Sequence, residues 1–127
     1  MQKYWVIVGD SGTTRWYKDA KMTILHRVGG PAMEYADGDK SWWLNDNIHR
    51  TDGPAAEYAD GSKVWYLNGH RHRTDGPAVE WPNGTKEWWL NGQQLTEQEH
   101  AHRVNPAQEM TVAEIEKLLG KRIKIIK

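Results

Sequence analysis

Histidine and arginine recur together along this chain, and both side chains can bind anions. His-Arg pairs stand at residues 26–27, 49–50 and 72–73, a spacing of 23 residues. Arginine offers a planar fork of donors that fits phosphate or carboxylate, so the pairs can form an anion-binding ladder. The alternative is that Arg50 or Arg73 bonds the glutamate of a neighbouring unit. We favour this structural role because a glutamate recurs in every unit, at Glu34, Glu57 and Glu80.

Two other patterns resemble metal or catalytic sites but are incomplete. His70 and His72, and likewise His100 and His102, would place two imidazoles on one face of a strand, as a metal site requires. Neither pair has a third ligand nearby in the sequence. The serines beside turns lack a nucleophile motif: Ser11, Ser41 and Ser62. A repeated glutamate does not give the asymmetric constellation of an active site. We therefore expect no catalytic residue, no metal and no cofactor, and a protein that is not an enzyme.

An aromatic stripe is the sharpest candidate for a binding site. Trp43, Tyr66 and Trp89 occupy the same position of successive units, and Tyr17 stands at the end of the stripe. Aromatic rings beside arginine are typical of protein-interface hot spots, and they can also stack on a base or on ADP-ribose. The alternative is that the tail helix covers this face. The predicted partner-binding residues are Trp43, Tyr66, Trp89, Tyr17, Glu57, Arg71 and Arg73.

These side chains must be positioned by a repeated element. Residues 26–48, 49–71 and 72–94 align as three units, and eleven of their 23 positions are identical. A partial unit precedes them near 4–25, and a degenerate one, 102–107, follows them. We expect a repeat array over 1–107 and a separate C-terminal cap over 108–127, since repeat arrays need capped ends.

Each unit is predicted to be a β-hairpin, because Asp-Gly and Asn-Gly favour two-residue type I′ turns. With Asp60-Gly61 as such a turn, Glu57 pairs with Val64 and Ala56 with Trp65. With Asn68-Gly69 as the next, Tyr66 pairs with Arg71 and Val64 with Arg73. The register then gives two faces. The packed face would carry Ala56, Tyr58, Lys63, Trp65, Leu67 and their equivalents, and the other face Ala55, Glu57, Val64 and Tyr66.

The tail has a different pattern. Thr111 and Glu114 form a capping box, an apolar stripe follows over 112–119, Gly120 is a natural helix stop, and 123–126 has the pattern of a strand. The predicted fold is mainly β: a single-layer antiparallel meander of 23-residue hairpin repeats with a C-terminal helix–strand cap.

The amino-acid composition disfavours several classes of partner and chemistry. The chain has 127 residues, with 17 Lys+Arg against 17 Asp+Glu, and it has no cysteine. The net charge of zero disfavours nucleic acid as a partner. The absence of cysteine excludes disulfides and thiol chemistry. The longest apolar run, 4–8, is far shorter than a membrane span, and we see no signal peptide. We expect a cytoplasmic protein that contacts no membrane.

The hairpin unit resembles MORN-type repeats. The variant His-Arg-x-Asp-Gly-Pro-Ala followed by Gly-x-Lys-x-Trp-Tyr-Leu-Asn-Gly, as at 49–69, is similar to repeats of small accessory proteins in T-even-like tailed phages. The first unit departs from it at Gly29 and Asp46. The resemblance implies a non-enzymatic phage protein that inhibits a host defence enzyme or toxin, such as an ADP-ribosylating toxin, by direct contact in the host cytoplasm. The alternatives are a sponge for a nucleotide immune signal and a structural or chaperone-like accessory protein.

Overall fold

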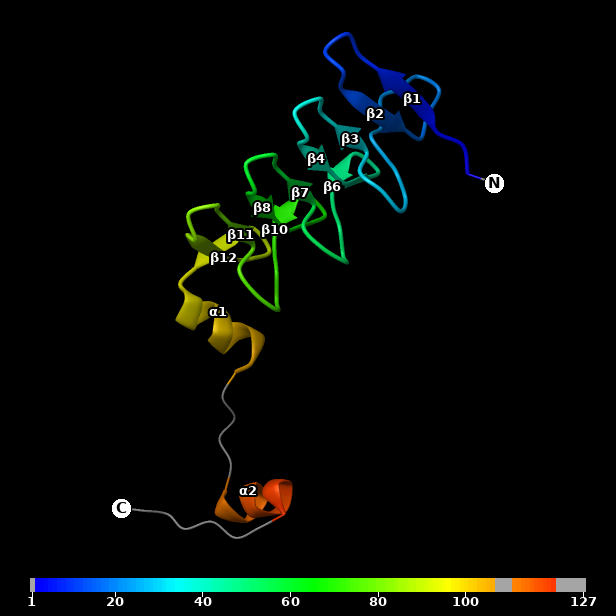
Figure 1. Ribbon diagram of the computed structural model, residues 1–127. Coiled ribbons are helices and arrows are strands. Elements are labelled where there is room, and N and C mark those ends of the chain that lie inside the picture. Colours follow the sequence, from blue (N-terminus) through cyan, green and yellow to red (C-terminus); the bar gives the residue numbers. More distant parts are fainter. Residues whose placement is uncertain (1, 107–110, 121–127) are drawn as a thin grey trace.

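The chain folds into a row of β-hairpins followed by helices, as the computed structural model of residues 2–106 and 111–120 shows (Figure 1). The predicted mainly β, antiparallel arrangement is confirmed. Nine strands form one sheet in the order β1-β2-β3-β4-β7-β8-β11-β12-β13. Their bounds are β1 Trp5–Val8, β2 Thr14–Tyr17, β3 Met33–Glu34, β4 Lys40–Ser41, β7 Ala56–Glu57, β8 Lys63–Val64, β11 Val79–Glu80, β12 Lys86–Leu90 and β13 Gln93–Leu95.

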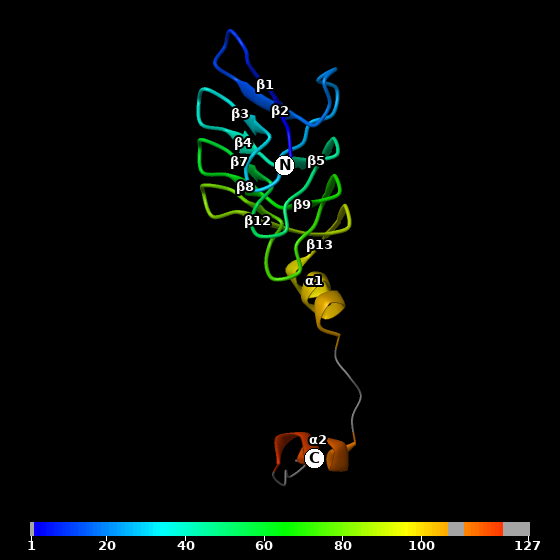
Figure 2. The same ribbon diagram turned by 90° about the vertical axis from the view of Figure 1, so that its right-hand side faces the viewer.

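The meander is not a single continuous layer. Two small sheets stand beside the main one, β5 (Trp43–Leu44) with β6 (Asn47–Ile48), and β9 (Tyr66–Leu67) with β10 (His70–Arg71). The second strand of each of these units breaks at a tryptophan, whose N–H donates to the next unit: Trp42 to Ala55 O and Trp65 to Ala78 O, both at 2.8 Å. Each repeat thus projects one hairpin to either side of the array (Figure 2).

The two kinds of turn differ, and only one matches the prediction. At Asn68-Gly69 both residues have positive φ, 49° and 84°, and Tyr66 pairs with Arg71 as predicted. At Asp60-Gly61 only the glycine has positive φ, and Tyr58 N–H donates to Ser62 O across a three-residue loop. The Asp60 carboxylate accepts the Ser62 N–H at 2.8 Å, and this aspartate turn stabilises the longer loop.

The longer loop shifts the register of the first hairpin by one residue. Ala56 pairs with Val64, and Glu57 with Lys63, so the predicted pairs of Glu57 with Val64 and Ala56 with Trp65 are wrong. A one-residue shift moves the second strand to the opposite face. The core consists of Ala56, Val64 and Val79, with Ile48, Tyr66 and Trp89 packed against it. Trp65, predicted for the packed face, lies on the other side of the sheet.

Helix α1, Glu97–Val104, packs against β12 and β13 at the end of the array. Thr96 and Glu99 close its capping box. The expected degenerate repeat at 102–107 is therefore wrong for His102–Val104, which are helical. The prediction that His100 and His102 share one face of a strand is wrong for the same reason. Of the helices that the structure describes, none is long and apolar enough to cross a membrane.

Helix α2, Val112–Leu119, forms where the tail was predicted to be helical. Thr111 and Glu114 form the predicted capping box, and Gly120 ends the helix with a φ of 68°. The predicted strand at 123–126 lies outside the described residues. The capping role of 108–127 stays a prediction, since the contacts to the last strands come from α1.

Candidate binding surfaces

The histidine of each His-Arg pair closes its own unit. The Nδ1 atoms of His26, His49 and His72 accept the backbone N–H of Asn45, Asn68 and Asn91 at 2.9, 2.9 and 3.0 Å. Only an unprotonated Nδ1 can accept this bond. Burial, helped by the positive charge of Lys18, lowers the pKa of His26. These imidazoles therefore hold the second hairpin of each unit in place.

The arginine of each pair joins neighbouring units. The guanidinium groups of Arg27, Arg50 and Arg73 lie over the indole rings of Trp16, Trp42 and Trp65, 4.0, 4.0 and 3.9 Å from the ring centroids. Each tryptophan belongs to the preceding unit, so the cation–π contact runs along the whole array. We call this set the Arg–Trp ladder: Arg27, Arg50, Arg73, Trp16, Trp42 and Trp65.

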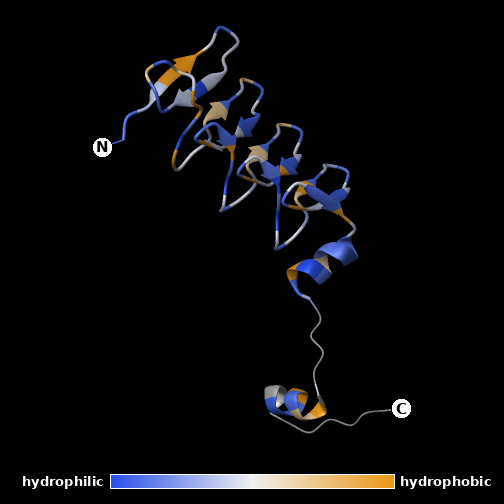
Figure 3. Ribbon diagram, turned by 180° about the vertical axis from the view of Figure 1, so that it is seen from behind, coloured by the Kyte–Doolittle hydropathy of each residue, from blue (hydrophilic) through white to orange (hydrophobic). Residues whose placement is uncertain are grey.

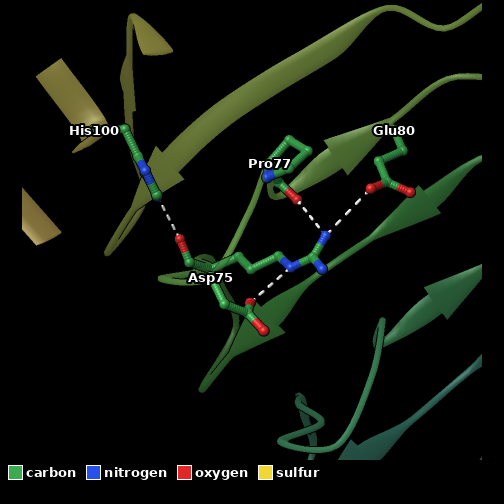
Figure 4. Close-up of polar contacts among 5 residues, drawn as sticks. Asp75, Pro77, Glu80 and His100 are labelled. Carbon is green, nitrogen blue, oxygen red and sulfur yellow. Dashed lines mark hydrogen bonds and ion pairs between the residues drawn. The ribbon is translucent and has the colours of Figure 1, made fainter. Parts of the chain in front are cut away.

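Further polar contacts fix the guanidinium groups, and Figure 4 shows those of the third unit. Arg73 donates to Asp75 at 2.9 Å, to the Pro77 carbonyl at 3.1 Å and to Glu80 at 3.2 Å. Arg50 repeats all three contacts with Asp52, Pro54 and Glu57. The structural role of the arginines is thus supported, but the glutamate belongs to the same unit rather than to a neighbouring one.

The ladder also explains the invariant glycine of each unit. A Cβ at Gly53 or Gly76 would stand 2.9 or 2.8 Å from the arginine Cζ of the same unit. The guanidinium is held between this glycine and the tryptophan ring of the preceding unit. The alanine after the proline, Ala55 or Ala78, is fully buried. Most of the His-Arg-x-Asp-Gly-Pro-Ala motif therefore has a partner inside the array.

The predicted site residues divide between the two faces of the sheet. Tyr66 and Trp89 pack against the core cluster, half-buried, and Arg71 lies 5.0 Å from the Trp89 ring centroid. Trp43, also half-buried, donates its indole N–H to Ser41, and Tyr17 pairs with Leu25 at the equivalent position. Glu57 and Arg73 lie apart from these aromatics: Arg73 belongs to the ladder, and Glu57 accepts a hydrogen bond from Arg50 of the ladder.

A second aromatic row was missed by the sequence analysis. Tyr35, Tyr58 and Trp81 were predicted to be packed, yet their exposed fractions are 42, 44 and 40%. Because side chains alternate along a strand, Tyr58 shares the face of Ala56, Val64 and Tyr66. Partial burial and then the nearby Tyr66 raise the pKa of Tyr58. The signal available in the sequence was an aromatic residue two positions before Asp37-Gly38, Asp60-Gly61 and Asn83-Gly84.

The two rows meet at Glu87. Its carboxylate accepts the indole N–H of Trp81 at 2.9 Å and that of Trp89 at 3.0 Å, and it lies 3.7 Å from Arg71. These contacts orient two indole rings and one guanidinium side by side. We call the following residues the aromatic face: Tyr35, Tyr58, Trp81, Tyr66, Trp89 and Arg71.

The opposite side carries clefts between successive His-Arg loops. One of about 420 Å³ is lined by Arg50, Trp65 and Arg73, and its counterpart of about 410 Å³ by Arg27, Trp42 and Arg50. The Arg50 and Arg73 guanidinium groups there already bond carboxylates of the chain. Over residues 2–106 and 111–120, no group of three His, Cys, Asp or Glu side chains has the arrangement of a metal site.

Helix α1 completes the ladder with a different residue. His100, 3% exposed, lies 5.1 Å from Trp88, centroid to centroid. Trp88 is the counterpart of Trp65, so an imidazole stands where the other units have an arginine. The His100 Nε2 also contacts the Arg73 carbonyl at 2.5 Å (Figure 4), which makes it the donor.

Comparisons of the chain with protein-family models, with curated proteins and with solved structures found no match.

Proposed function

We propose that this chain is a non-enzymatic binding protein that contacts a protein partner through its aromatic face. The observation that carries the proposal is the exposure of Tyr35, Tyr58 and Trp81 beside the half-buried Tyr66 and Trp89. Monomeric proteins seldom expose contiguous apolar surface without a binding role. Tyrosine, tryptophan and arginine are also the residues that supply most hot-spot energy at interfaces.

The distribution of polar bonds supports the choice of this face. In the ladder, each of the arginines Arg50 and Arg73 already has three polar partners. On the aromatic face, Glu87 holds Trp81, Trp89 and Arg71 in fixed positions while the rings keep exposed surface. Pre-ordered side chains lose less entropy on binding. We therefore keep Tyr66, Trp89 and Arg71 in the contact together with the exposed row, and leave Glu57 and Arg73 out of it.

The finer proposal concerns the partner. The resemblance of the repeat to those of T-even-like phage accessory proteins favours a host defence enzyme or toxin, inhibited by direct contact in the host cytoplasm. A protein target is favoured over a nucleotide ligand because the arginines that line the clefts are occupied by carboxylates of the chain.

The test is a pull-down from host-cell lysate followed by titration of the captured protein. The variant carries Tyr35→Ser, Tyr58→Ser and Trp81→Ser, and the matched control is Val28→Ser, an apolar residue 61% exposed outside the aromatic face. We expect the control to capture the partner and the triple variant to lose it. A triple variant that binds as tightly as the wild type would contradict the proposal, and a nucleotide released on heat denaturation would favour the sponge.

A further inference from the structure

One edge of the main sheet is open and apolar. Among the strands of residues 2–106 and 111–120, β1 stands first in the strand order and pairs with β2 alone. Its four residues, Trp-Val-Ile-Val, are 37, 50, 37 and 68% exposed, and it is the most hydrophobic strand in Figure 3. Exposed apolar edge strands are templates for pairing, and proteins usually protect them with charge, proline or a bulge. Strand β1 contains no charged residue, no proline and no bulge.

The other end of the array is protected. Strand β13 contributes two glutamines and a buried Leu95, and α1 packs beside it. Of the strands in the part of the chain that the structure describes, β1 alone has every residue exposed. The asymmetry indicates that β1 has a partner of its own.

The hydrogen bonding of the first hairpin shows which backbone groups are free. Gly9 N–H donates to Thr13 O at 2.8 Å, and Val8 stands opposite Thr14. Hydrogen-bonded and non-bonded pairs alternate along an antiparallel ladder. Trp5 and Ile7 therefore bond β2, whereas the N–H and C=O groups of Tyr4, Val6 and Val8 point to the open edge.

We propose that β1 pairs with β1 of a second copy of this chain, antiparallel, about a two-fold axis at Val6. In this register Val6 stands opposite Val6 of the second copy, and Val8 opposite Tyr4, so all three outward-pointing residues are bonded. Trp5 then faces Ile7 across the close, non-bonded pairs, and aromatic–β-branched pairs of this kind are favourable. An antiparallel pair of identical strands is self-complementary, as a two-fold interface requires.

Charge favours the same arrangement. The strand carries no charge, and its flanks are Lys3 and Asp10. Antiparallel pairing places Lys3 of one copy beside the Asp10 end of the other, whereas parallel pairing would place Lys3 beside Lys3. The chain as a whole is neutral, so two copies approach without net repulsion.

Pairing through β1 would also bring two aromatic faces together. A two-fold axis perpendicular to the joined sheets keeps equivalent faces on the same side. Both aromatic faces would then lie on one side of a continuous sheet, and a partner with two binding sites would gain avidity without any new contact.

The experiment measures the mass of the purified full chain by light scattering and sedimentation over a dilution series. We expect the wild type to have twice the 14.7 kDa chain mass. Val6→Lys should be monomeric, with a dissociation constant raised at least about 100-fold, because two lysines would stand directly opposite each other. The matched control Val104→Lys, an exposed valine on α1, should remain dimeric. Circular dichroism checks that each variant is folded.

A mixture tests the register itself. Val6→Glu alone should also be monomeric, but mixing it with Val6→Lys should restore a dimer, since residue 6 would face residue 6. A monomeric wild type, a dimer unaffected by Val6→Lys, or a mixture that stays monomeric would overturn the proposal. A wild type that is monomeric alone and binds a different protein through β1 would overturn the second copy as the occupant.

Discussion

The two faces of the repeat sheet use their side chains in opposite ways. On the ladder side, Arg50 and Arg73 each stack on a tryptophan and bond two carboxylates and a carbonyl. On the aromatic face, Tyr58 and Trp81 keep about two fifths of their surface exposed. The ladder positions are identical in all three units, whereas the aromatic positions hold tyrosine in some units and tryptophan in others. For these two sets of residues, strict recurrence accompanies contacts inside the array, and looser recurrence accompanies exposed surface.

The largest effect we predict tests whether the ladder stabilises the array. Arg73→Ala should lower the free energy of unfolding by about 3 kcal/mol, because it uncovers Trp65 and removes two carboxylate partners. Arg27→Ala should lower it by about 1 kcal/mol, since Gly29 replaces the aspartate and Glu34 lies 3.9 Å away. Denaturant melts of both variants measure the difference. Equal losses would show that the carboxylates contribute little.

The aromatic face should behave in the reverse manner. Tyr58→Ser with Trp81→Ser should weaken partner binding by at least about 2 kcal/mol, a hot-spot magnitude. The free energy of unfolding should change by less than about 1 kcal/mol, since both side chains are exposed. Titration against the captured partner and a denaturant melt give the two numbers. A large loss of stability with unchanged affinity would reverse the roles that we assign to the faces.

The end of the ladder should show an intermediate effect. His100→Ala removes the imidazole from Trp88 and leaves the Arg73 carbonyl without its donor, at a cost of about 2 kcal/mol. The control is His102→Ala, an exposed residue of the same helix, which should change stability by less than about 0.5 kcal/mol. Thermal or denaturant melts compare them. If both variants melt like the wild type, α1 does not stabilise the array.

The sequence predicted the hairpins, but it did not predict the faces, and the turns explain why. Asn68-Gly69 and Asn83-Gly84 are the same dipeptide, yet the first makes a two-residue turn with two positive φ angles and the second a three-residue loop in which only the glycine has one. In the second, Asn83 Oδ1 accepts the N–H of Thr85. Position in the unit, not the dipeptide, decides the turn type. One added loop residue was enough to move Trp65 and Val64 to the opposite faces.

The candidate site was predictable only in part for the same reason. Tyr66 and Arg71 stand on either side of a true two-residue turn, so their pairing was predicted correctly. Tyr58 and Trp81 precede the longer loops and were assigned to the core. The Arg–Trp contacts join different units through space, and no spacing within one unit encodes them. His100 could not be recognised as a ladder residue, because the helix that carries it replaces the repeat pattern.

The smallest effect we predict concerns the histidines that close the ladder units. The pKa of His26 in the folded chain lies below its ordinary value of 6.5 because the ring is buried and Lys18 is near. The unfolded chain therefore binds a proton first as the pH falls. The contribution of His26 to stability is complete above pH 6.5 and is lost as the pH falls through the lowered pKa of the folded chain.

His26→Gln replaces the titrating acceptor with a neutral amide oxygen. The free energy of unfolding of this variant should therefore fall less between pH 7 and pH 5 than that of the wild type. Lys18→Met should also weaken the pH dependence, because removing that positive charge brings the folded pKa closer to the unfolded one. Denaturant melts at a series of pH values measure both slopes. A slope unchanged by His26→Gln would mean that the unprotonated Nδ1 bond to Asn45 does not hold the unit closed.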